Sequence, residues 1–247
     1  PYLPDDFREK HRSVWVDIDS KLFDPVKANA VYHTYMDQLE FAEELGFDGI
    51  GVHEHHQNGY GIMPSPNIIA AGLARRTSKA ALCVIGNSIA LYNPALRVAE
   101  EFAMLDVISG GRLVAGFPVG TSMDTNYAYG QIPALTRDKY AEAHELIMRA
   151  WAEDEPFAFD GKYQQLRYVN CWPKPIQKPH PPMWMACTNR ATIEVAARNG
   201  LGVLAFSFLD PQSAAHWAEV YYSIIKSDQC VPIGHAVNPN IAMVTSF

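Results

Sequence analysis

The sequence lacks an apolar run near the roughly 18 residues that a membrane-spanning helix requires, which excludes an integral membrane protein of that kind. It also lacks any block of lysine and arginine, and its formal charge of −7 argues against a surface that binds nucleic acid. Among 247 residues, 17 prolines and 16 glycines are ordinary numbers, which argues against disordered and collagen-like chains. The composition, 48% hydrophobic, therefore predicts a globular protein with a sizeable core.

Cysteine is scarce, and its spacing contains no CxxC pair. Such usage favours free thiols in a reducing compartment over a disulfide framework or a zinc finger. The first six residues show no basic segment leading into an apolar stretch, so no signal peptide is visible. We therefore expect a cytoplasmic protein with four free cysteines: Cys83, Cys171, Cys187 and Cys230.

Short apolar runs alternate with amphipathic helices along the chain. The runs are apolar nearly throughout, which is typical of buried parallel strands. Between them, apolar residues recur every three or four positions, as in Val98, Phe102 and Leu105, which indicates helices with one buried side. The seven predicted strands are residues 14–18, 49–52, 82–85, 113–117, 183–186, 203–206 and 241–245.

Repeated βα units predict a parallel sheet with helices outside it, as an open doubly wound sheet or a (β/α)8 barrel. The long loop 156–181 contains an aromatic segment broken at Asp160-Gly161, which predicts an inserted β-hairpin. Seven strands are one fewer than a closed barrel needs, so the last strand is expected to be missing from a truncated or incomplete barrel. We expect a single domain over residues 1–247.

Histidines and a carboxylate gather where the second predicted strand ends, in His53-Glu54-His55-His56. In parallel α/β folds, functional groups lie at the carboxyl ends of the strands. An imidazole beside a carboxylate suits general acid–base catalysis, and a His-x-His pair also suits a metal. The other six histidines lie at none of the later strand ends, so a multi-strand metal site is disfavoured and no metal is expected.

Three other strand ends allow a ligand without requiring one. Asn87-Ser88 would let a flat ligand approach the backbone, or form an ordinary turn. The loop 116–122 contains glycine and could cover a ligand. At Thr188-Asn189 a helix begins, and its first amides suit an anion such as phosphate, although plain capping explains the same residues.

These motifs make the sequence similar to the bacterial-luciferase-like family of flavin-dependent monooxygenases. The resemblance covers roughly residues 30–206, and the Glu-His-His and Ser-Gly-Gly-Arg motifs are its most specific parts. It implies a (β/α)8 TIM barrel with residues 156–181 as a family insertion. The matching segments are 44–49, Glu54-His55-His56, 65–71, 93–101, 105–112 and 186–200.

The resemblance also implies an activity: oxidation of a small apolar organic substrate with dioxygen and reduced FMN, which a separate flavin reductase supplies. It implies a homodimer and makes His55 the catalytic histidine. Aromatic residues such as Phe117, Tyr127 and Tyr129, with the segment 206–209, could supply the apolar lid that such chemistry needs, although aromatic core packing explains the same residues equally well. The cofactor-binding residues that it implies are Asn87, Ser88, Gly120, Cys187, Thr188, Asn189 and Thr192.

One position departs from the family pattern. Val119 stands where bacterial luciferase has an arginine that binds the flavin phosphate, so Arg190 or Arg137 would replace it, or flavin would bind weakly. Two other functions remain as alternatives. One is hydride transfer with the deazaflavin F420, which the histidine cluster makes the less favoured enzyme, and the other is flavin binding without catalysis.

Overall fold

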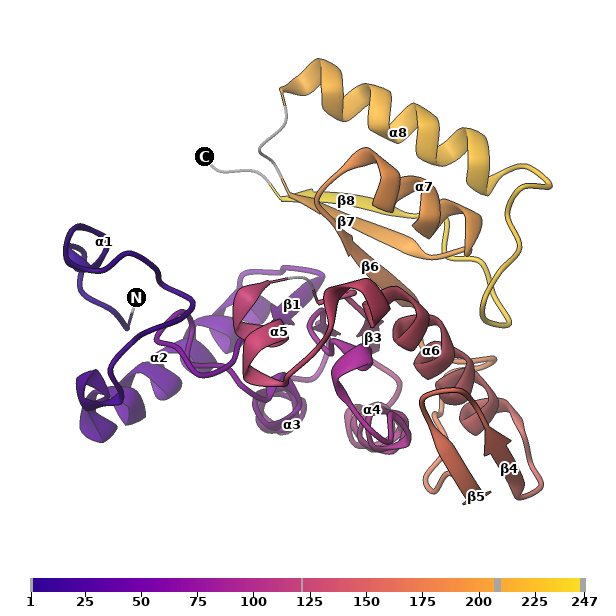
Figure 1. Ribbon diagram of the computed structural model, residues 1–247, viewed down its shortest axis with the longest axis horizontal. Helices are drawn as coiled ribbons and strands as arrows, with labels where there is room; N and C mark the ends of the chain where they lie inside the picture. Colours follow the sequence, from indigo (N-terminus) through magenta and orange to yellow (C-terminus); the bar gives the residue numbers. More distant parts are fainter. Residues whose placement is uncertain (1, 121, 207–209, 245–247) are drawn as a thin grey trace.

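Six parallel strands form one sheet in the computed structural model, which describes residues 2–120, 122–206 and 210–244 (Figure 1). The strands follow the order β1-β2-β3-β6-β7-β8. In the register of the sheet, Cys83 of β2 lies opposite Gly51 of β1 on one side and Val114 of β3 on the other. The strands are β1 (Gly49–Val52), β2 (Ala81–Val84), β3 (Leu113–Gly116), β6 (Met183–Cys187), β7 (Gly202–Phe206) and β8 (Ile241–Val244).

Three of the longer helices begin at a side-chain cap. Asp24 accepts hydrogen bonds from the amides of Val26 and Lys27, and Asn189 and Asp210 cap two later helices in the same way. The longer helices are α2 (Pro25–Glu44), α3 (Pro66–Arg76), α4 (Leu96–Ser109), α6 (Thr136–Ala152), α7 (Arg190–Arg198) and α8 (Pro211–Ile225). The shorter ones are α1 (Phe7–Lys10), α5 (Met123–Ala128) and the 3-10 turns η1 (Ser20–Leu22), η2 (Ile89–Leu91) and η3 (Pro133–Leu135).

The sheet curls into a half-barrel, with helices on its outer side (Figure 1). Helices α3, α4 and α6 cover β1–β3, while α7 and α8 pack together over β6–β8. The α/β class and the parallel sheet are as predicted, but a closed (β/α)8 barrel is not formed within the described residues. Six strands in one sheet are too few to close an eight-stranded barrel.

The predicted strand at residues 14–18 is wrong. The Ser13 hydroxyl accepts hydrogen bonds from the amides of Trp15 (3.0 Å) and Val16 (3.3 Å), which makes a local turn. Asp17 then takes a left-handed conformation, with φ of +59°. Because these two amides bond within the segment and the chain turns at Asp17, the segment cannot form the hydrogen-bond ladder of a strand. It runs instead as a loop across the end of β1.

The other predicted strands lie within one residue of those observed. The prediction for β1 has the observed ends, while Ile85 and Phe117 fall just beyond β2 and β3. The expected end of the last strand, Thr245, lies outside the described residues, as do residues 207–209 of the expected lid. The inserted hairpin is confirmed as β4 (Phe157–Asp160) paired antiparallel with β5 (Gln165–Val169).

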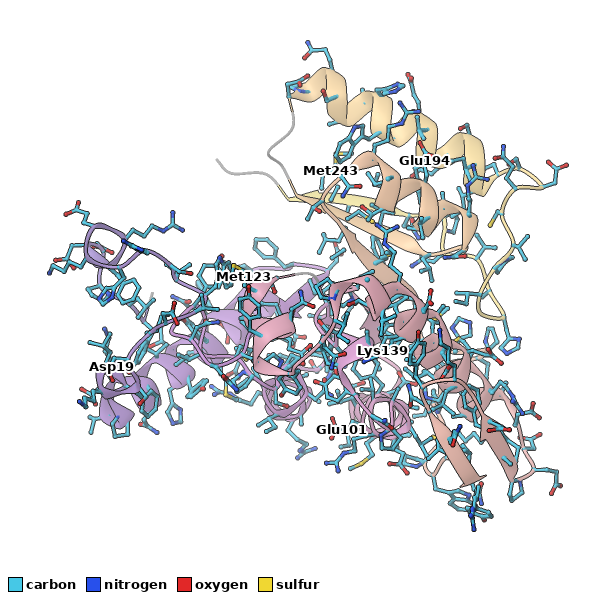
Figure 2. All side chains as sticks on the ribbon, viewed as in Figure 1. Asp19, Glu101, Met123, Lys139, Glu194 and Met243 are labelled. Atoms are coloured by element: carbon cyan, nitrogen blue, oxygen red, sulfur yellow. The ribbon has the colours of Figure 1, made fainter. Side chains whose placement is uncertain are left out.

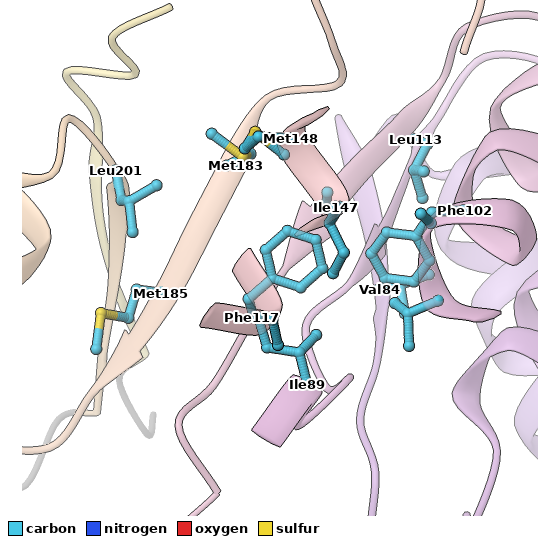
Figure 3. Close-up of a cluster of buried hydrophobic side chains, with 14 of the residues drawn as sticks. Val84, Ile89, Phe102, Leu113, Phe117, Ile147, Met148, Met183, Met185 and Leu201 are labelled. Atoms are coloured by element: carbon cyan, nitrogen blue, oxygen red, sulfur yellow. The ribbon is translucent and has the colours of Figure 1, made fainter. Parts of the chain in front are cut away.

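The core lies between the sheet and its outer helices (Figure 3). Phe102 of α4 stacks on Phe117 at 5.4 Å between ring centroids, and Ile147 of α6 is buried in the same cluster. Phe117 is only 1% exposed, so it is a core residue and not the lid residue that was predicted. Tyr127 of α5 and Tyr129, the residue after that helix, are exposed.

The Ser-Gly-Gly-Arg motif has a structural role in this fold. The Arg112 guanidinium donates hydrogen bonds to the carbonyl oxygens of Ala74 (3.1 Å), Thr77 (3.1 Å) and Ala80 (2.7 Å). Carbonyl groups at the end of a helix have no partner within the helix, so this cation satisfies the end of α3. The motif thereby joins α4, the end of α3 and the start of β2.

None of the helices in the described ranges is long and apolar enough to cross a membrane. The four cysteines are free, as predicted.

Candidate active site

The four residues after β1 divide between two sides of the sheet. Ile50 and Val52 of β1 are buried toward the helices, and Glu54 and His56 continue on that buried side with 5% and 2% exposure. His55 points the other way, and its side chain is 20% exposed. Because successive side chains of a strand alternate, this short segment delivers both a buried acid and an accessible imidazole.

The accessible imidazole is held by a carboxylate from a distant helix. Nδ1 of His55 lies 2.9 Å from Oδ2 of Asp124, which belongs to α5. The same oxygen accepts a hydrogen bond from the amide of His56 at 3.0 Å. A carboxylate on Nδ1 keeps the proton on that nitrogen, so Nε2, on the opposite side of the ring, presents its lone pair to a ligand.

Asp124 is fully buried and charged. Burial alone would raise the pKa of its carboxyl, but hydrogen bonds from His55, Ser122 and the amide of His56 outweigh that effect and hold the pKa far below its usual range. Its second oxygen, Oδ1, is buried with no hydrogen-bond partner among the described residues. The carboxylate is thus committed to His55 and its neighbour.

Aromatic rings surround His55 on its exposed side. The Trp15 ring lies 4.8 Å from the imidazole centroid, and Tyr60 meets it edge-on at 5.2 Å. His53 lies 4.9 Å away. Burial lowers the pKa of His53, and proximity to His55 lowers it further. The mispredicted segment 14–18 therefore contributes Trp15 as a partial cover over the imidazole.

Glu54 ties the histidine cluster to the next strand end. Its Oε2 accepts a hydrogen bond from the amide of Ser88 at 2.7 Å, and its Oε1 lies 3.0 Å from Nε2 of His56. The Tyr92 hydroxyl donates to Oε1 as well. Burial, together with the nearby Glu54 charge, raises the pKa of Tyr92. Three donors around one buried carboxylate fix the relative positions of the ends of β1 and β2.

Two of the predicted cofactor residues, Ser88 and Gly120, lie together beside this network. A side chain at Gly120 would come within 2.8 Å of Ser88 Oγ, and the φ of Gly120 is +74°. Only glycine allows this close approach and this backbone conformation without strain. The loop after β3 is thus held directly against the end of β2.

Asn87, in contrast, has its side chain engaged in the fold. It exchanges amide hydrogen bonds with Asn67 of α3 at 2.8 Å and 3.2 Å, and Asn67 also donates to Glu101 of α4 at 2.6 Å. Asn87 is only 1% exposed. Its position leaves the main chain, not the amide side chain, as the part that could face a ligand.

The remaining predicted residues gather at the start of α7. Asn189 caps the helix by accepting from the amide of Thr192 at 3.1 Å, and the Thr192 hydroxyl donates to the carbonyl oxygen of Asn189 at 2.7 Å. Thr188 is exposed. The Cys187 thiol is fully buried, and burial raises its pKa to about 12. This group and the His55 group share the carboxyl edge of the sheet, and among the described residues no hydrogen bond or ion pair joins them.

Sequence reasoning missed Asp124 and Trp15. Asp124 is the only carboxylate between Asp106 and Asp138, in a stretch rich in glycine and neutral residues. That isolation did not by itself indicate a pairing with His55, which depends on how the fold places α5 beside the end of β1.

The comparisons with known proteins place this chain in a family. The model for luciferase-like monooxygenases matches residues 18–229, so the chain belongs to that family. The first relatives include an uncharacterised protein, y4wF, of Sinorhizobium fredii, which is 35% identical over 71% of this chain and 52% of its own length. The oxygenase component of a flavin-dependent trigonelline monooxygenase from Acinetobacter baylyi is 28% identical over 70% of this chain and 48% of its own length.

Solved structures share the fold. Monooxygenase RslO1 from Streptomyces bottropensis matches with a TM-score of 0.73 and 28% identity, covering 86% of this chain and 64% of that chain. The oxygenating constituent of 3,6-diketocamphane monooxygenase of Pseudomonas putida, in complex with FMN, matches with a TM-score of 0.72 and 18% identity over 87% of this chain and 61% of that chain. An F420-dependent secondary alcohol dehydrogenase matches with a TM-score of 0.69 and 21% identity, over 86% and 64%. The chain spans about half the length of the curated relatives it matches.

Proposed function

We propose that this chain is the oxygenase component of a two-component monooxygenase that uses reduced FMN and dioxygen to oxidise a small apolar organic molecule. The observation that carries the proposal is the His55–Asp124 pair at the carboxyl edge of the sheet. Membership of the luciferase-like family and the name of the Acinetobacter relative support it. That relative is called an oxygenase component, which is why we assign a flavin reductase as the partner.

The residues at the sheet edge suit a flavin. Gly51 is exposed on the concave side of β1, with Cys83 of β2 opposite it, and a Cβ at Gly51 would lie 3.0 Å from the Ile85 side chain, so the surface at this point is small and apolar. At the start of α7, backbone amides and the Thr188 hydroxyl are the kind of donors that hold a phosphate, and the Thr192 hydroxyl would join them by turning from the Asn189 carbonyl oxygen to the ligand. Reduced FMN, when bound, supplies the electrons that activate dioxygen.

The residues of the chain have separate tasks in this proposal. Asp124 holds the Nδ1 proton of His55, so Nε2 accepts or delivers a proton at the reacting atoms. Trp15 and Tyr60 restrict the access of water to the imidazole. Ser88 and Gly120 bring the main chain of two strand ends close to the ring system, and the start of α7 binds the phosphate.

The test is an anaerobic titration with reduced FMN followed by stopped-flow mixing with oxygenated buffer. We expect saturable binding and then a transient absorbance distinct from both oxidised and reduced flavin, which His55→Ala shortens or abolishes. Binding without a transient would instead support a flavin-binding protein without catalysis. Sedimentation of the same sample tests the proposed homodimer.

The second candidate function is hydride transfer with F420. The solved F420-dependent alcohol dehydrogenase, which shares the fold, is the observation that favours it. Tight binding of F420 with no binding of reduced FMN would replace the monooxygenase proposal by this one.

A further inference from the structure

A cavity of about 530 Å³ lies against His55, on the side of the N-terminal segment. Resting on the proposed function, we propose that this cavity binds the organic substrate, and that the substrate is a neutral, largely apolar molecule. The volume is in the usual range for small-molecule sites. Two segments form its walls, residues 18–23 and the loop 55–64 after β1, and Tyr2, Leu3 and Tyr32 complete it.

The walls are mainly apolar. Ile18, Leu22 and Phe23 come from one side, and Ile62 and Pro64 come from the other. Leu22 is 48% exposed and Phe23 is 54% exposed, although both line the cavity. Apolar side chains gathered around a hollow at the surface gain free energy when an apolar molecule displaces the water between them.

The charge of the cavity selects against anions. Asp19, labelled at the N-terminal end of the molecule in Figure 2, is the only acidic side chain in the lining, and neither lysine nor arginine is present there. Asp19 also accepts a hydrogen bond from the amide of Lys21 at 2.9 Å, which holds its carboxylate at the rim turn. A carboxylate or phosphate on the ligand would meet this negative charge, and the nearby Lys27 ammonium is engaged by the carbonyl oxygen and ring of Tyr2, outside the lining.

The backbone around the cavity is strained. Three non-glycine residues of the described chain have positive φ, namely Asp17 (+59°), Gln57 (+54°) and Ile62 (+43°). Gln57 and Ile62 line the cavity, and Asp17 precedes a lining residue. A β-branched residue such as Ile62 rarely adopts this conformation, and the Tyr32 hydroxyl donates to its carbonyl oxygen and holds it. Such strain gathers where a binding site imposes a shape on the chain.

His55 is the link between the cavity and the chemistry. Its ring lines the cavity, while its Nδ1 is committed to Asp124 outside the lining. A molecule in the cavity therefore lies against the one imidazole of the cluster that can exchange a proton with it. The Gln57 amide at the same end offers a hydrogen bond to a single polar group on an otherwise apolar ligand.

The experiment measures binding of N-phenyl-1-naphthylamine, a neutral apolar fluorophore, to the whole chain. We expect saturable binding at one site, weakened at least tenfold in Ile18→Trp and in Leu22→Trp, because the larger ring fills the cavity. Val26→Trp is the matched control, since Val26 is 79% exposed nearby on α2 and lies outside the lining. It should bind within about twofold of wild type. The anionic probe 1-anilinonaphthalene-8-sulfonate should bind more weakly than the neutral one.

Absence of binding by the wild type, or equal binding by wild type and both cavity variants, overturns the assignment. Preference for the anionic probe overturns the neutral-ligand part. The affinity for reduced FMN, measured on the same variants, should stay unchanged. If the protein binds the naphthylamine as expected but does not bind reduced FMN, the proposed function is refuted and the cavity assignment stands. If it binds reduced FMN but not the naphthylamine, the cavity assignment alone is refuted.

Discussion

Nδ1 of His55 lies 2.9 Å from Oδ2 of Asp124, and this single hydrogen bond joins the end of β1 to α5 across 69 residues of sequence. The acid is fully buried and the base is partly open, so one partner is fixed by the fold while the other faces a cavity. This asymmetry is what a proton-transfer group needs, because orientation and access are supplied by different residues.

Replacing Asp124 by Asn keeps the size of the side chain and removes its charge. Without a carboxylate on Nδ1, His55 loses its preferred tautomer, and we expect turnover to fall by about 10²–10⁴-fold. The affinity for reduced FMN should change by less than about threefold, as it should in His55→Ala. Asp154→Asn, at an exposed position, is the control and should retain full turnover. Near-normal turnover in Asp124→Asn would mean that the carboxylate does not position the base.

The start of α7 is tested by comparing two flavins. The double variant Thr188→Ala with Thr192→Ala should bind FMN about tenfold or more weakly than the wild type, since a hydrogen bond to a charged group contributes about 1.5–3 kcal/mol. Riboflavin, which has no phosphate, should bind as it does to the wild type. Thr34→Ala on the exposed surface of α2 serves as the control. Equal weakening of both flavins would show that the phosphate lies elsewhere.

Glu54→Gln is expected to destabilise the fold. The glutamine oxygen must keep accepting from the Ser88 amide, so the glutamine NH2 faces Nε2 of His56 and the Tyr92 hydroxyl, both of which must change from donor to acceptor, and the negative charge that these donors stabilise is lost. The loss should be about 2–4 kcal/mol in the free energy of unfolding, measured with urea. Glu155→Gln, at an exposed position, should change it by less than about 0.5 kcal/mol. A Glu54→Gln protein as stable as wild type would refute the role given to this network.

The buried His144 is expected to make the fold less stable in acid. Both its ring nitrogens are buried without a hydrogen-bond partner among the described residues, and burial lowers its pKa to about 4. In the unfolded chain the His144 imidazole binds a proton near pH 6.5, whereas in the folded chain it binds one only near pH 4. The free energy of unfolding therefore falls as the pH falls through this window. The loss from this group amounts to about 3 kcal/mol.

The measurement is the urea midpoint at pH 7 and at pH 4.5. His144→Leu should flatten the difference between the two midpoints, whereas His216→Leu, an exposed substitution on α8, should leave it as in the wild type. An unchanged pH dependence in His144→Leu would assign the acid sensitivity to other groups, such as His180, whose pKa burial also lowers.

Much of the fold could be predicted from the sequence because its elements are encoded locally. Six strands are short apolar runs, the helices between them repeat apolar residues every three or four positions, and α7 and α8 begin at their own side-chain caps. Residues 14–18 have the same apolar character, yet they are not a strand. The difference lies in the Ser13 hydroxyl, which captures two amides, and in the turn at Asp17, neither of which an apolar pattern reveals.

Only part of the candidate site could be predicted from the sequence. His55 was predicted because a histidine cluster follows a strand, and Ser88 and Gly120 do lie beside that cluster. Asp124 could not be predicted, because its pairing with His55 depends on how β3 and α5 are placed. The side chain of Asn87 packs against Asn67 for a similar reason: the residue type suits a ligand and a helix contact equally well.

The separation of His55 and Asp124 in sequence also means that the two residues are synthesised at different times. A ribosome adds roughly 5–20 residues per second, so roughly 3–14 seconds separate the synthesis of the base from the synthesis of the acid that orients it. Once Tyr92 has been added, a nascent chain has the residues that hold the ends of β1 and β2 together, but until Asp124 follows it has no carboxylate to orient the imidazole. The base therefore waits for its acid after the network behind it is complete in sequence.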